Sequence, residues 1–122
     1  MMVRSIVAGL MLGGMVFSGA GLLAAPTFDG NWSVLIVTDR GQCDSAYRYG
    51  LVIRNGQVIY EGDASVNVAG RVSGNGAVSV RVSAGSQSAN GTGRLSSAQG
   101  GGTWRGNGSS GTCSGTWSAE RR

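Results

Sequence analysis

Apolar and polar residues alternate over strand-length stretches from Thr27 onward, and turn-forming Gly, Asn and Ser interrupt them every roughly 8 to 12 residues. No window of this region carries apolar residues at helical spacing. The predicted strands lie near Trp32–Thr38, Tyr47–Arg54, Gln57–Gly62, Ser65–Ser73, Ala77–Ser83, Ser88–Leu95, Thr103–Gly106 and Thr112–Ala119. The pattern predicts an all-β fold, a small eight-stranded antiparallel up-and-down barrel, with a two-sheet β-sandwich as the alternative.

The best-defined turn is Asn55-Gly56, which lies between two alternating runs. This dipeptide supplies the two positive-φ positions of a type I′ hairpin. The register then places Arg54 opposite Gln57, Ile53 opposite Val58, Val52 opposite Ile59, Leu51 opposite Tyr60, Gly50 opposite Glu61 and Arg48 opposite Asp63.

Alternation also assigns the large aromatic side chains to one face, which we expect to be the interior. These predicted core anchors are Trp32, Trp104, Trp117, Tyr47, Tyr49 and Tyr60. Glycines on the inward face of the last strands make room for the indoles, and this argues against a roomy pocket, while whether the interior is filled or hollow is left open. The stretches SAQGGG and GNGSSG are predicted to be flexible loops at the rim.

Residues 1–25 have the features of a secretory signal, because Arg4 precedes a long apolar run from Ser5 to Leu23. An uncleaved membrane anchor is the alternative. We expect a single β domain over residues 26–122, in the periplasm or secreted, with no stable membrane span once the signal is removed. The cleavage point is left open between Ala20 and Ala25.

The two cysteines, Cys43 and Cys113, suit an oxidising compartment and are predicted to form a disulfide, with two free thiols as the alternative. If the last strand pairs with the first, this disulfide holds the seam of the barrel. A bridge over so long a loop stabilises a small domain by about 4 kcal/mol in the chain-entropy model.

The residues available for chemistry argue against an enzyme, a metal site or a cofactor. The chain contains no His, and all ten basic residues are arginine. Serine and cysteine triads, histidine zinc sites and lysine nucleophiles are therefore excluded. Glu61 and Asp63 form a carboxylate pair, but an ion pair with Arg48 explains Asp63 without catalysis.

Two surface features are candidate binding sites. Asp39 and Asp44 flank a loop and could offer oxygens to calcium, although turn-forming aspartates lack the alternating acids of a dedicated site. Four apolar residues, Leu35, Val37, Val52 and Ile59, face outward on strands expected to be neighbours. They are a candidate patch for a partner or self-association, and scattered surface residues or a layer under a loop are the alternatives.

Several motifs carry a resemblance to known proteins. FDGNWSV, GQC, RYGLVIRNG, GRLSSAQGGGTWRG and CSGTWSAERR resemble a family of small exported proteins of Gram-negative bacteria whose function is not established. Gly30-Asn31-Trp32, with Arg121 or Arg122, is similar to the signature of the calycin barrels: lipocalins, avidins and bacterial metalloprotease inhibitors. That resemblance implies a first-strand tryptophan packed near a basic residue of the last strand, and a mouth or rim that binds a ligand or protease.

These observations predict an exported, non-catalytic β-barrel that binds an unknown protein or small ligand, as an inhibitor or a ligand carrier. The alternative is a structural or adhesive envelope protein, whose arginine face contacts anionic envelope glycan or lipopolysaccharide. The basic residues are dispersed rather than clustered, which argues against nucleic acid as a partner.

Overall fold

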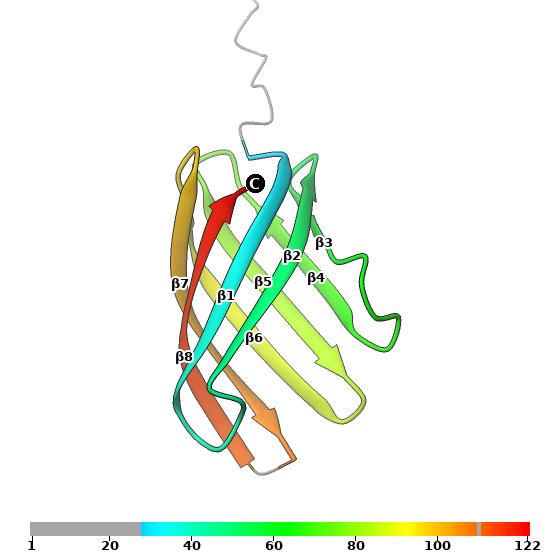
Figure 1. Ribbon diagram of the computed structural model, residues 1–122. Coiled ribbons are helices and arrows are strands. Elements are labelled where there is room, and N and C mark those ends of the chain that lie inside the picture. The colour runs from blue at the N-terminus through cyan, green and yellow to red at the C-terminus, as the bar shows by residue number, and fades with distance from the viewer. Residues whose placement is uncertain (1–27, 110) are drawn as a thin grey trace, which may run out of the picture.

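The computed structural model describes residues 28–109 and 111–122, so the predicted signal at residues 1–25 lies outside the described residues. The fold is a closed antiparallel barrel in which consecutive strands pair and β8 returns to β1 (Figure 1). The strands are β1 (Gly30–Arg40), β2 (Ala46–Arg54), β3 (Gln57–Ile59), β4 (Asn67–Val72), β5 (Ala77–Ala84), β6 (Gln87–Leu95), β7 (Gln99–Gly108) and β8 (Gly111–Arg121). The up-and-down barrel is confirmed and the sandwich alternative is wrong. Within the described part of the chain, no helix is long and apolar enough to cross a membrane.

The hairpin between β2 and β3 confirms the predicted turn. Asn55 and Gly56 have φ values of 54° and 76°, and the carboxylate of Asp29 accepts both of their backbone N–H groups at 2.7 and 3.2 Å. The three predicted pairs from Arg54–Gln57 to Val52–Ile59 are present.

The remaining predicted pairs of this hairpin are wrong, because β3 ends at Ile59. Asp63 turns back on its own segment and accepts hydrogen bonds from the backbone and hydroxyl of Ser65 at 2.9 and 2.8 Å. Arg48 instead donates to the Ser33 hydroxyl at 2.9 Å. The ion pair predicted between Arg48 and Asp63 is therefore not formed.

The glycine-rich stretches predicted as flexible loops are largely strand, since β7 begins at Gln99 and pairs with β8 as far as Gly108–Gly111. Glycine is required in this part of the wall for close approach. A Cβ at Gly102 would collide with the carbonyl oxygen of Thr92, and one at Gly106 with that of Ser88. Their composition resembles a linker, but these glycines let the backbone of the neighbouring strand approach closely.

The two Gly-Thr-Trp triplets lie opposite each other in β7 and β8, so that Gly102 faces Trp117 and Trp104 faces Gly115. Each indole crosses the glycine of the neighbouring strand and donates to a carbonyl one strand further on. Trp104 Nε1 bonds Val37 O at 3.0 Å, and Trp117 Nε1 bonds Thr92 O at 3.1 Å. The paired triplets therefore connect four consecutive strands, β6, β7, β8 and β1.

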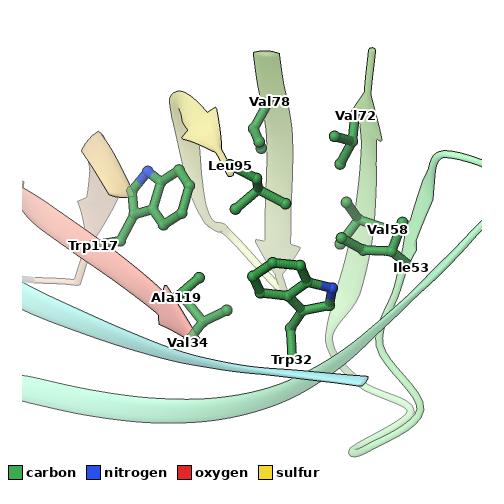
Figure 2. Close-up of a cluster of buried hydrophobic side chains, with 9 residues drawn as sticks. All are labelled: Trp32, Val34, Ile53, Val58, Val72, Val78, Leu95, Trp117 and Ala119. Carbon is green, nitrogen blue, oxygen red and sulfur yellow. The ribbon is translucent and has the colours of Figure 1, made fainter. Parts of the chain in front are cut away.

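The packed core occupies one end of the barrel, where β1 begins and β8 ends (Figure 1). Figure 2 shows its side chains converging from every strand except β7. They are Trp32, Val34, Ile53, Val58, Val72, Val78, Leu95, Trp117 and Ala119. The opposite end of the barrel has no comparable plug among the described residues, and this leaves room for a site.

Candidate binding cavity

The barrel interior holds a cavity of about 520 Å³, whose lining extends from core side chains such as Trp32 and Leu95 to Gln42 and Asp44 at the opposite end. The glycine-lined core argued against a roomy pocket but left open whether the interior is filled or hollow, and this cavity answers that question. The wall here is lined by short side chains, including Val66, Val68, Val80, Val82 and Ala89. The indoles of Trp104 and Trp117 reach carbonyls of the wall, so they extend along it rather than across the centre. The volume falls within the roughly 300 to 1,000 Å³ of small-molecule sites.

All six predicted aromatic anchors line this interior. Trp32 and Trp117 are buried, at 1% and 9% exposure, and Trp104 packs against their cluster. Tyr47 is 50% exposed and is no core residue, which corrects that part of the prediction. Alternation correctly gave its direction, but it lies near the open end, where no facing side chain covers it.

The three tyrosines form a row of rings at the mouth. The ring centroids of Tyr47 and Tyr49 are 5.8 Å apart, and those of Tyr49 and Tyr60 are also 5.8 Å apart, with the second pair edge to face. The row extends from the exposed rim to the half-buried wall, so a ligand entering the cavity would meet aromatic surface first.

Asp44 sets the electrostatics of this mouth. A hydrogen bond from the Tyr47 hydroxyl to the Asp44 carboxylate raises the pKa of Tyr47, and the negative charge of Asp44 adds to this effect. Burial raises the pKa of Tyr49, with smaller contributions from Tyr60 and Asp44. Both tyrosines are therefore held in the neutral, protonated form.

The loop that carries Asp44 is fixed at three points. Cys43 is bonded to Cys113 of β8, which confirms the predicted disulfide, with a Cα–Cα distance of 6.2 Å. Thr38 donates its backbone N–H to Ser45 O at 3.0 Å and its hydroxyl to Asp44 O at 2.7 Å. Gly41 takes a φ of 97° and packs so closely on β8 that a side chain would collide with the carbonyl oxygen of Thr112.

The strand pairing that forms the barrel wall is interrupted beside the mouth. β2 pairs with β3 only over residues 52–54, and β3 pairs with β4 only at Gln57 and Val58. Residues 46–51 of β2 are thus bonded to β1 but have no strand partner on their other side among the residues that the structure describes. The segment 60–66 connects β3 to β4 here, and both its ends, Tyr60 and Val66, line the cavity, whereas residues 61–65 are exposed.

The closed end carries a contact between the first and last strands. The guanidinium carbon of Arg121 lies 4.7 Å from the centre of the Trp32 ring. Arg121 also donates to Asp29 O at 2.7 Å and to Ser97 O at 2.8 Å, while the Trp32 indole donates to Phe28 O at 2.9 Å. The first-strand tryptophan and last-strand arginine therefore meet, and together they hold the barrel shut at this end.

The four outward apolar residues lie in two separate pairs. Val52 is opposite Ile59, whereas Leu35 and Val37 lie further along β1, opposite Arg48 and Ala46. Because Val52 faces Asn31, Leu35 is four residues away, about 13 Å along the strand. The expected single cluster is corrected to two pairs, with the Arg48–Ser33 hydrogen bond beside the gap between them.

The candidate carboxylate groups are not assembled into a site. Glu61 lies 3.9 Å from Arg54, and the hydrogen bonds from Ser65 lower the pKa of Asp63. In the described ranges, no three His, Cys, Asp or Glu residues are placed to hold a metal ion. Asp44, considered for calcium, lies at the cavity mouth, whereas Asp39 does not line the cavity.

Sequence reasoning missed the cavity and the position of Asp44. A clue was available, because Asp44 follows a cysteine that was expected to bridge to the last strand, which places it at the barrel rim. The chain matches no protein-family model, and it has no match among curated proteins or solved structures.

Proposed function

We propose that this protein is an exported, non-catalytic carrier of a small, largely apolar molecule, acting in the periplasm or after secretion. The observation that carries the proposal is the cavity of about 520 Å³ in the barrel interior. Its wall is mostly valine, alanine, glycine and aromatic residues, with nine polar residues in addition. Pockets of this size and lining are typical of sites for small ligands.

Support for export comes from the Cys43–Cys113 disulfide, because such bonds persist in oxidising compartments. Support for a carrier over an enzyme comes from the lining, which offers no histidine or lysine to act as a base or nucleophile. The inhibitor form of the prediction rests on the calycin resemblance alone.

The carrier proposal is tested with the neutral fluorescent probe N-phenyl-1-naphthylamine and a pair of matched variants. Ala89 lines the cavity on β6, opposite Gly106, so Ala89→Trp places an indole in the hollow. Ala69 on β4 is exposed and does not line it, so Ala69→Trp adds the same side chain outside.

We expect the probe to bind wild type and Ala69→Trp alike and to lose at least about tenfold in affinity, about 1.4 kcal/mol, with Ala89→Trp. Circular dichroism and thermal melting show whether each variant keeps the fold. Equal binding to a folded Ala89→Trp and to wild type, or no binding to wild type, would contradict the proposal.

A second candidate function is contact with an anionic envelope glycan or lipopolysaccharide, and one row of residues favours it. The register aligns Arg81 of β5, Asn90 of β6, Arg105 of β7, Ser114 of β8 and Arg40 of β1 around the barrel. All three arginines are exposed, and Arg81 and Arg105 are two strands, about 10 Å, apart.

This candidate predicts retention on immobilised lipopolysaccharide that weakens as salt is raised. Arg81→Gln with Arg105→Gln should reduce retention more than Arg54→Gln, since Arg54 lies outside the row. Retention that is independent of salt, or equal for both variants, rules the candidate out.

A further inference from the structure

The cavity has an uneven distribution of charge. The structure describes nine arginines, and none of them lines the cavity. Of its six carboxylate side chains, Asp44 alone contributes to the lining. Although the sequence has a net charge of +4, the formal charge facing the cavity is therefore negative. An anionic ligand would find no cation to pair with in this wall.

Aromatic rings accompany this charge. Tyr47, Tyr49 and Tyr60 line the same mouth in edge and tilted contacts. The faces of aromatic rings attract cations, and ammonium groups are often recognised by several rings beside one another. A carboxylate next to such rings strengthens the preference for a positive headgroup.

The position of the carboxylate is set by the fold. The disulfide at Cys43 and the two hydrogen bonds of Thr38 hold the backbone on both sides of Asp44. The Asp44 carboxylate raises the pKa of the Tyr47 hydroxyl, and both residues line the cavity. Charge and rings are thus arranged before any ligand arrives.

We propose that the mouth of the cavity binds the ammonium headgroup of a cationic amphiphile, with Asp44 and the three tyrosines around the headgroup and the apolar tail in the valine-lined interior. This inference rests on the proposed carrier function and names its ligand class. The tail would contact Val68, Val80 and Val82, which line the interior on β4 and β5.

The test compares three probes that share one tail and differ in headgroup: octyltrimethylammonium, octyl glucoside and octyl sulfate, each below its micelle concentration. Affinities are measured by isothermal titration calorimetry. We expect the cation to bind about tenfold tighter than the glucoside, equivalent to about 1.4 kcal/mol, and the sulfate to bind most weakly. Added salt should weaken binding of the cation and leave binding of the glucoside unchanged.

Two matched variants test whether the preference for the cation comes from Asp44. Asp44→Asn removes the charge at the mouth, and Asp39→Asn removes an exposed charge at the end of β1 that does not line the cavity. We expect Asp44→Asn to abolish most of the preference for the cation while glucoside binding is retained, and Asp39→Asn to leave both affinities unchanged.

The outcomes separate the two proposals. If the glucoside and the cation bind equally to wild type, the headgroup inference fails and the carrier function stands. Equal effects of Asp44→Asn and Asp39→Asn also overturn the inference. If neither these probes nor the neutral fluorescent probe bind, both proposals fail. A salt-sensitive preference that disappears only with Asp44→Asn supports the inference.

Discussion

The glycines of the last strands have specific partners at the residue scale. Gly115 lies under the Trp104 indole in the pairing of β7 with β8, and a Cβ there would meet the carbonyl of Val37. Gly74, in the turn between β4 and β5, has open space around its Cα. Two residues of the same type therefore carry very different constraints.

Gly115→Ala is expected to lower the free energy of unfolding by about 1 to 3 kcal/mol, the usual effect of overpacking. Gly74→Ala provides the control and should change it by less than about 0.5 kcal/mol. Urea denaturation followed by tryptophan fluorescence measures both. A similar small change in the two variants would contradict the close packing at Gly115.

Asp44 raises the pKa of Tyr47 and of Tyr49, so Asp44→Asn should lower both. Titration followed by the NMR signals of the tyrosine ring carbons measures each residue separately. Asp39→Asn is the matched control. If both tyrosine pKa values stay unchanged in Asp44→Asn, the assigned contact with Asp44 is wrong.

The raised pKa of Tyr49 also predicts the direction in which stability changes with pH. The folded-state pKa of Tyr49 is raised above its ordinary value of 10.0, so the unfolded chain releases this proton first. Stability should therefore fall as pH rises beyond 10.0, with no contribution from this group below it. Thermal melting of wild type and Tyr49→Phe across this range checks the direction, since the variant lacks the titrating group.

Elements were predictable from sequence where side chains alternate, and less so where glycine replaces them. β1, β2, β4, β5, β6 and β8 lie within one or two residues of their expected bounds, because large and polar side chains alternate between opposite faces along them. β7 was expected only over Thr103–Gly106, since glycine carries no face information and its strand pairing rests on neighbours. β3 was expected to be longer, and the Asp63–Ser65 turn ends the alternation before the ladder can continue.

The disulfide joins the loop after β1 to β8, across a seam that the two strands also form by backbone pairing. The bridge spans 70 residues of sequence, so reducing it should lower stability by about 4 kcal/mol in the chain-entropy model. The melting temperature of wild type with and without reductant measures this, and the Cys43→Ser, Cys113→Ser double variant should match the reduced protein. An unchanged melting temperature would show that the seam is held by strand pairing alone.

At the scale of the whole molecule, alternation correctly predicted which side chains face the barrel interior. It did not predict whether those side chains fill the interior or leave a cavity. The same alternation of valine and aromatic residues is compatible with a filled or a hollow barrel. Volume depends on how the side chains meet across the interior, and Trp104 and Trp117 reach backbone carbonyls of the wall that no pattern of alternation specifies. The core therefore forms at one end only.

This division predicts uneven hydrogen exchange along single strands. Val52 and Ile53 of β2 lie beside the packed core and pair on both sides, whereas residues 46–51 pair only with β1 among the described strands. We expect amides in the second group that point away from β1 to exchange at least about tenfold faster, since unpaired and less packed amides open locally. Exchange measured by NMR tests this, and uniform protection along β2 would contradict an interrupted wall.

The facing Gly-Thr-Trp triplets also have a consequence for how the chain selects its pairing. A slip of β8 against β7 by two residues would preserve the inward and outward faces, so alternation alone does not forbid it. Such a slip would move each indole away from its opposing glycine. In one direction it would place the indoles of Trp104 and Trp117 opposite each other. The pairing of large with small residues therefore favours a single strand register. Without it, the repetitive glycines in this part of the barrel would permit several registers.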